Sequence, residues 1–200
     1  MIKLLVPLPK DVTVALSGGV DSVAVADFLS RKHTVSCAFF HHGTENSDRA
    51  FRFVSEFCTQ RRMPLFMGFI KGTKPAGASE EEFWRDSRYE FLESLNLTVV
   101  TAHNLDDCVE TYIHSSLHGT AKVIPVQRNN VVRPFLTTRK LEFIDWAGRK
   151  GLDWCEDLSN NDLRYTRNYI RKHLVPHALH VNPGLHKTVR RIVERQLTQE

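Results

Sequence analysis

The chain has 200 residues, of which 42% are hydrophobic and 25% are charged, and its formal net charge at pH 7 is +4, as is ordinary for a soluble globular protein. No stretch approaches the ~20 apolar residues of a membrane span, and Pro7 interrupts the N-terminal segment too early for a secretion signal. Four widely spaced cysteines without a Cys-x-x-Cys pair exclude a clear zinc site and predict reduced thiols in a cytoplasmic protein.

Strand and helix patterns alternate along the chain as far as residue 117. We expect strands at 12–16, 35–40, 64–70 and 97–100. We expect helices at 20–31, at 48–61, from the cap Ser79 onward, and from the N-cap Asn104 through Leu117. This alternation predicts parallel βαβ units and therefore an α/β fold with a doubly wound, mostly parallel, Rossmann-like sheet.

After Pro134 the strand signal fades, and helices are expected at 138–150, 163–180 and 183–197. We therefore expect an α/β domain over 1–135 and a helical C-terminal segment over 136–200 packed on it. Ligands of doubly wound sheets lie at the carboxyl ends of the strands, so functional residues are sought in the loops that follow those ends.

The loop after the first strand has the composition of a phosphate-binding loop. It reads Ser17-Gly18-Gly19-Val20-Asp21-Ser22. Glycine amides and a helix start suit an anion, two serines add hydroxyl donors, and Asp21 suits an Mg²⁺ shared with phosphates. The alternative is an ordinary Asp-Ser helix cap after a glycine turn. The loop is neither a Walker loop nor a dinucleotide fingerprint, because the required lysine and third glycine are missing.

This loop is similar to the pyrophosphatase loop of the N-type ATP pyrophosphatases, also called the PP-loop superfamily. The resemblance implies an ATP-binding enzyme that splits ATP to AMP and pyrophosphate with Mg²⁺, and it assigns 1–135 to the pyrophosphatase domain. Base-thiolating members of the superfamily typically use cysteine pairs, which this chain lacks.

Further segments, in the same order, resemble the tRNA(Ile)-lysidine synthetases. They are Phe-Phe-His-His-Gly at 39–43, Arg-Asp-Ser-Arg-Tyr at 85–89, the segment 102–111 with His103 and Asp106-Asp107, Arg-Pro-Phe-Leu at 133–136, the segment 154–160, and the arginine-rich segment 164–171. The resemblance covers the catalytic domain, whereas members of the family usually continue into C-terminal domains that grip the tRNA. It implies a ligase that adenylates the wobble cytidine of an isoleucine tRNA and joins free lysine to it.

Three carboxylates at the start of one helix are the strongest catalytic candidates. Asp106 and Asp107 lie in its first turn, and Glu110 follows one turn later. Such a group suggests Mg²⁺ binding, with Asp21, Asp107 and Glu110 as ligands, or a general base for an incoming amine. Under the resemblance, Asp107 or Asp106 would deprotonate the lysine or hold its ammonium. A solvated acidic helix start is the alternative.

Two arginines and two histidines are weaker candidates. Arg85 and Arg88 share one helical face and could neutralise phosphate or developing charge, although surface ion pairs are an ordinary alternative. His42 and His103 follow strands; His42 is assigned to the nucleotide and His103 to catalysis, and each could equally be a hydrogen-bonded structural side chain.

Basic residues gather at the C-terminal end. Residues 161–200 contain eight Lys or Arg against three acids, a net +5, which favours a nucleic-acid partner. The candidate tRNA contacts are Arg164, Arg167, Arg171, Arg190 and Arg191. Solvated helix faces are the alternative to these contacts. For the function of the chain, the alternatives are another adenylating enzyme of the superfamily and a non-catalytic tRNA- or nucleotide-binding protein. A homodimer is left open.

Overall fold

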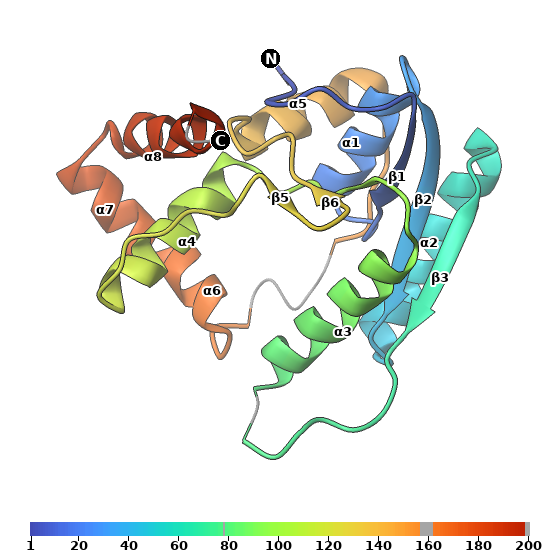
Figure 1. Ribbon diagram of the computed structural model, residues 1–200, viewed down its shortest axis with the longest axis horizontal. Coiled ribbons are helices and arrows are strands. Elements are labelled where there is room, and N and C mark those ends of the chain that lie inside the picture. The colour runs from blue at the N-terminus through green and yellow to red at the C-terminus, as the bar shows by residue number, and fades with distance from the viewer. Residues whose placement is uncertain (78, 157–161, 199–200) are drawn as a thin grey trace.

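One mixed sheet organises the protein. The computed structural model describes residues 1–77, 79–156 and 162–198, and within them the strand order is β3-β2-β1-β4-β6-β5. The strands are β1 Asp11–Ala15, β2 Thr34–His41, β3 Leu65–Phe69, β4 Val99–Val100, β5 Gln127–Arg128 and β6 Val131–Val132. All neighbouring strands are parallel except β5 and β6. The expected doubly wound α/β fold is confirmed (Figure 1).

Helices alternate with the parallel strands, and after β6 the described residues form helices without further strands. They are α1 Val20–Ser30, α2 Glu45–Arg61, α3 Glu80–Ser94, α4 Leu105–Leu117, α5 Lys140–Lys150, α6 Thr166–Tyr169, the π-helix η2 Ile170–Leu174, α7 Val175–Val181, α8 Leu185–Arg195 and the 3₁₀ turn η3 Gln196–Thr198. Two predicted caps are confirmed: Ser79 accepts from the amide of Glu82 at the start of α3, and Asn104 caps α4. No helix in the described ranges is long and apolar enough to cross a membrane.

Both faces of the sheet are covered by helices, and alternate side chains of each strand pack into the cores on opposite faces. On β2, Cys37 and Phe39 belong to the core that α1, α2 and α5 share with β1. The intervening Ala38 packs on the other side with Tyr89 and Leu92 of α3. This arrangement leaves the carboxyl ends of β1, β4 and β6 facing the N-termini of α1 and α4.

The C-terminal helices pack at one end of the molecule, away from the β2–β3 edge (Figure 1). Leu185, Val189 and Val193 of α8 share a core with Leu105 and Val109 of α4. This packing sets the C-terminal segment directly against the acidic helix. The division into two parts at residue 135 stays a prediction.

The predicted helix over 163–180 is present from Thr166 to Val181, with one π-helical stretch within it. It begins at Thr166 and is interrupted by the π-helix η2, where the amide of Val175 donates to the carbonyl of Ile170. Pro176 lies directly after this turn. Proline has no amide hydrogen and its ring crowds the carbonyl four residues earlier, so the α-helical pattern cannot pass through this point unchanged.

The short strands β5 and β6 were not anticipated. Each has two residues, joined through Asn129 in the left-handed conformation with φ 52°. So short a run carries no periodic signal, and β6 is defined by its pairing with β4 rather than by its own sequence.

A close approach of α3 to the sheet gives the first prediction. A Cβ on Gly68 would lie 2.4 Å from the ring of Phe91, so Gly68→Ala should destabilise the protein by about 1–3 kcal/mol through overpacking. Gly148→Ala is the matched control, because the added methyl meets nothing within 4 Å and replaces glycine inside α5. Urea unfolding would measure both, and a Gly68→Ala midpoint equal to that of the wild type would contradict the packing.

Candidate active site

The loop between β1 and α1 presents an uncapped helix start. The N-cap of α1 is Gly19, no side chain caps it, and Asp21 lies inside the first turn. The alternative of an Asp-Ser cap therefore does not hold. Gly18 adopts the left-handed conformation with φ 88°, which favours glycine. Free first-turn amides at the positive end of a helix are suited to an oxyanion.

Hydrogen bonds from the Ser22 hydroxyl and from the backbone of Cys155 hold this loop in shape. The Ser22 hydroxyl donates to the carbonyl of Gly19 at 2.9 Å and accepts from the amide of Ser17 at 3.2 Å. The carbonyl of Gly18 accepts from the amide of Cys155 at 2.9 Å. Ser22 is buried and acts on the backbone, whereas Ser17 is exposed beside the helix start.

Asp21 is a carboxylate in an unfavourable place. Burial raises its pKa to about 6, Asp107 adds to the rise, and Lys140 opposes it. One oxygen, Oδ2, lies 3.6 Å from the ammonium of Lys140 and accepts from the side-chain amide of Asn104 at 3.3 Å. The other oxygen, Oδ1, is buried without a partner among the described residues. Such a group is a functional candidate, because burial without full pairing is costly.

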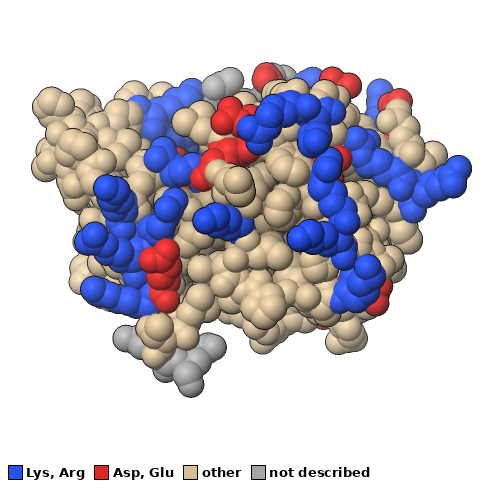
Figure 2. Space-filling model, turned by 90° about the horizontal axis from the view of Figure 1, so that it is seen from above, with Lys and Arg blue, Asp and Glu red and all other residues tan. Residues whose placement is uncertain are grey.

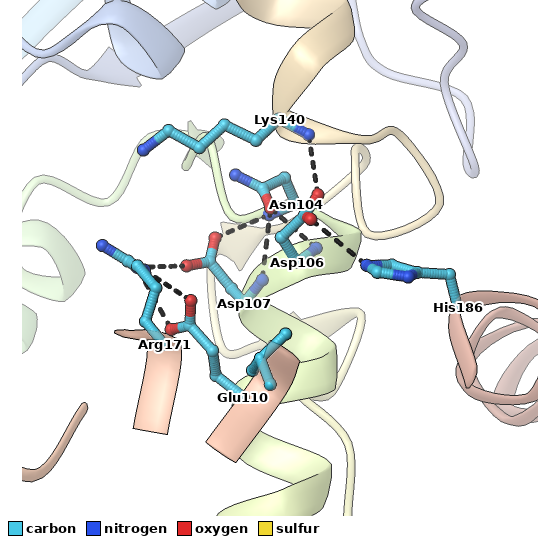
Figure 3. Close-up of a pocket in the computed structure, with 8 residues that line it drawn as sticks. Asn104, Asp106, Asp107, Glu110, Lys140, Arg171 and His186 are labelled. Carbon is cyan, nitrogen blue, oxygen red and sulfur yellow. Dashed lines mark hydrogen bonds and ion pairs between the residues drawn. The ribbon is translucent and has the colours of Figure 1, made fainter. Parts of the chain in front are cut away.

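The side chain of Asn104 joins the phosphate loop to the acidic helix, and Figure 3 shows its contacts with the acidic helix. Its Oδ1 accepts from the amides of Asp106 and Asp107, at 2.9 and 3.2 Å, while its Nδ2 donates to Asp21. Asp107 returns the contact by accepting from the Asn104 amide at 2.9 Å, which completes a capping box. A cavity of about 130 Å³ lies beside them, and its lining residues are Asn104, Asp106, Asp107, Glu110, Lys140, Arg171, Val175 and His186.

Asp106 has a structural set of partners. Its Oδ2 accepts from the amide of Lys140 at 2.8 Å and from Arg139 at 3.2 Å, and its Oδ1 contacts His186 at 3.2 Å. Burial alone would raise the pKa of Asp106, but the contacts with His186, Lys140 and Arg139 outweigh it and hold the pKa at about 2. Asp106 thus ties α5 and α8 to α4, and both of its oxygens are engaged.

Glu110 is paired with an arginine. Its two oxygens accept from Arg171 at 2.6 and 3.1 Å, and Arg167 lies 3.7 Å away. Among the described residues, no three His, Cys, Asp or Glu are placed to hold a metal ion. The expected ligand set of Asp21, Asp107 and Glu110 is therefore corrected, because the guanidinium of Arg171 occupies the carboxylate of Glu110.

This ion pair carries the second prediction. Glu110 is 3% exposed, so Glu110→Gln should remove the nearest charge partner of Arg171, leave only Asp107 at 3.7 Å among the described residues, and destabilise the protein by about 3 kcal/mol. Asp162→Asn, which breaks the exposed pair with Arg164, should leave the melting temperature unchanged. Equal melting temperatures for the two variants would contradict a stabilising role for the pair.

Arg88 and His103 lie near each other, beside the acidic site. Burial lowers the pKa of Arg88 and holds that of His103 well below its usual range, and the charges of Arg85, Arg133 and Arg167 add to both effects. His103 Nδ1 lies 2.8 Å from the hydroxyl of Thr101.

His42 lies directly after the end of β2 and contacts α3. Its ring packs against Phe40 and Trp84, with centroids 5.0 and 5.5 Å away. Its assignment to the nucleotide stays a prediction.

The basic helices do not present the expected stripes. Arg171 and Arg167 turn toward Glu110, Arg164 pairs with Asp162, and Arg190 donates to the carbonyl of Thr137 at 2.8 Å. Arg191 is exposed. The basic residues are not confined to two helices: Figure 2, which views the molecule from above, shows Lys and Arg spread over this face with Asp and Glu interspersed among them. Residues 157–161, 199 and 200 lie outside the described residues, including most of the 154–160 motif.

Sequence reasoning did not assign the lining residues Lys140, Arg171 and His186 to the cavity. Lys140 offered one signal, because a lysine at the first position of a helix opposes the helix dipole and so suggests another role. His186, which is buried, and Arg171, which was assigned to RNA, gave none, because their partners are 80 and 61 residues away.

A phosphate-binding loop at the end of β1, facing an acidic helix after β4, defines a nucleotide-binding α/β protein with its site at the topological switch of the sheet. The chain belongs to the PP-loop domain family, whose model matches residues 3–178.

The relatives and structural neighbours agree with this assignment. The chain is 32% identical to a tRNA(Ile)-lysidine synthase of Thermotoga sp. strain RQ2, over 91% of the chain and 48% of that protein. It is 30% identical to the synthase of Haemophilus ducreyi, over 97% of the chain and 48% of that protein. It thus spans about half the length of these curated relatives.

The NH3-dependent NAD synthetase of Campylobacter jejuni superposes with a TM-score of 0.56 at 15% identity, covering 94% of this chain and 86% of that one. At this identity the likeness concerns the fold alone.

Proposed function

We propose that this chain carries the catalytic site of a tRNA(Ile)-lysidine ligase. The observation that carries the proposal is the Asn104 bridge: one side chain contacts both Asp21 of the phosphate loop and the backbone of Asp107. Nucleotide activation and proton removal would therefore occur at one point. The relatives are named tRNA(Ile)-lysidine synthases, and the resemblance to that family implies a wobble cytidine and free lysine as the substrates.

The proposed reaction has two steps. The cytidine O2 attacks the α phosphorus of ATP and pyrophosphate leaves. The ε-amine of lysine then attacks C2, the C–O bond breaks, and AMP departs with the oxygen. Adenylation is needed because it turns a poor leaving oxygen into a good one.

The residues fit these steps. The uncapped start of α1 and Ser17 would hold the phosphates, and Lys140 would offset their charge. The unpartnered Oδ1 of Asp21 suits Mg²⁺, which would neutralise phosphate charge when bound. Asp107 would take the proton of the lysine amine. One of its oxygens accepts from the backbone amide of Asn104, whereas the other, among the described residues, has only the ion pair with Arg171 at 3.7 Å. Both oxygens of Asp106, by contrast, are engaged in hydrogen bonds.

The test is lysine transfer. The protein is incubated with ATP, Mg²⁺, labelled lysine and tRNA, and label is counted in precipitated RNA. Label that requires ATP supports the proposal. Because tRNA lies in the cytoplasm, we propose that the protein works there. RNA-dependent pyrophosphate release without lysine incorporation would replace lysine by another nucleophile, and absence of both signals would favour a binding protein.

A further inference from the structure

Four basic side chains come from four segments beside the proposed reaction site, and two of them, Arg88 and Arg133, contact the same ring, that of Tyr89. His103 follows β4, Arg133 follows β6, Arg88 lies on α3 and Arg167 on α6. Because β4 and β6 are parallel neighbours, with Val100 opposite Val132, residues 103 and 133 emerge at the same edge of the sheet. We propose that Arg88, Arg133 and Arg167, together with His103, form a binding site for a phosphate group.

The positive charge of this cluster is poorly compensated. Within the described ranges, Arg88 and Arg133 make no ion pair with a carboxylate, and Arg167 reaches only Glu110, at 3.7 Å. The guanidinium groups disfavour one another's charged forms: Arg167, Arg85 and Arg133 add to the burial that lowers the pKa of Arg88. An anion between them would relieve this repulsion in a partly desolvated setting.

Arg133 is fixed at the base of the cluster. It is 3% exposed, and its terminal nitrogens donate to the carbonyl of Pro125 at 2.8 Å and to the hydroxyl of Tyr89 at 2.9 Å. Its Nε is buried without a partner among the described residues. An unfilled buried donor is costly, and it is the kind of group that a ligand oxygen satisfies.

Tyr89 holds two members of the cluster together. The guanidinium carbons of Arg88 and Arg133 each lie 5.6 Å from the centre of its ring. Contact with one aromatic ring pre-orients both cations. His103 stays neutral, and when Thr101 donates to its Nδ1, the ring proton lies on Nε2, from which it can donate to an oxyanion.

The position of the cluster indicates which phosphates would reach it. His103 directly precedes Asn104, the residue that bridges Asp21 and Asp107. A phosphate here would lie next to the reacting groups. Under the proposed function, two sources share this chemistry: a phosphodiester flanking the modified nucleotide, and the pyrophosphate that leaves.

The test uses Arg88→Gln and Arg167→Gln, with Arg61→Gln as a charge-matched control from the far end of α2, where Arg61 covers the Phe57 ring. Thermal melts first establish that each variant is folded. Binding of a labelled anticodon stem-loop RNA is then measured by anisotropy over a range of salt, and binding of inorganic pyrophosphate by calorimetry, both without ATP or lysine.

We expect Arg88→Gln and Arg167→Gln to weaken one of these ligands about tenfold relative to Arg61→Gln. Loss of RNA affinity, with the salt slope reduced by about one, identifies a phosphodiester; loss of pyrophosphate affinity identifies the leaving group. Unchanged affinity for both ligands would overturn the site. Because lysine transfer is measured separately, failure of that assay would reject the proposed function without deciding on this phosphate site.

Discussion

Asp21→Asn is expected to lose pyrophosphate release by at least about 100-fold while becoming more stable. The loss follows from removing the charge that would share Mg²⁺ with the phosphates, since electrostatic groups at phosphoryl transfer typically contribute this much. The gain follows from burial: the native pKa of Asp21 is about 6, against 3.8 for the free side chain. Loss of activity with gain of stability distinguishes a functional carboxylate from a structural one.

The sign of the stability effect follows from the direction of the shift. A raised native pKa means that the folded protein favours the protonated form of Asp21, so the contribution of Asp21 to stability is greatest below about pH 4 and is lost as pH rises through about 6. At neutral pH the ionised Asp21 therefore costs up to about 3 kcal/mol, which the neutral asparagine avoids.

Urea unfolding at pH 7.5 in EDTA would measure the gain, and a pyrophosphate assay the loss. Asp27→Asn on the same helix is the control, because Asp27 binds Trp146 and Arg31 away from the cavity. We expect Asp27→Asn to retain activity. Asp21→Asn with full pyrophosphate release would sink the assignment of this loop to ATP phosphates.

Asp107→Asn is expected to block lysine transfer by about 10²- to 10⁴-fold while sparing RNA-dependent pyrophosphate release. An asparagine oxygen can still accept from the amide of Asn104, so the capping box survives and only the proton acceptor is lost. Separate assays of pyrophosphate release and of label in RNA resolve the two steps. Equal loss in both would assign Asp107 to activation of the cytidine rather than to lysine.

Asp106→Asn is the matched control for this variant, since the two residues are neighbours on α4. Its contacts with Arg139, Lys140 and His186 are structural, so the neutral variant should lower the melting temperature. The native pKa of about 2 means that this contribution is present above pH 4 and is lost as pH falls through about 2. Lysine transfer should persist in the folded fraction.

Much of the secondary structure could be predicted from patterns of residues that are close in the sequence. The Ser-Gly-Gly-Val-Asp-Ser loop was placed correctly because a buried strand before it and an apolar helix after it are periodic patterns. The start of α4 at Asn104 was placed because capping involves residues within one turn. The π-helical stretch within the helix over 163–180 was not predicted, because hydrophobic periodicity does not show the effect of Pro176 on the preceding turn.

The sequence by itself thus determined the α/β class, the phosphate loop and the acidic helix start. Only the tertiary structure decided which side chains contact each of the carboxylates. Asp106 and Asp107 are adjacent on a helix, where successive side chains point about 100° apart. Their surroundings therefore depend on which distant elements pack on each side: α5 and α8 bring Arg139 and His186 to Asp106, whereas the π-helix brings Arg171 toward Asp107. Such contacts depend on how distant segments pack, and no local pattern encodes them.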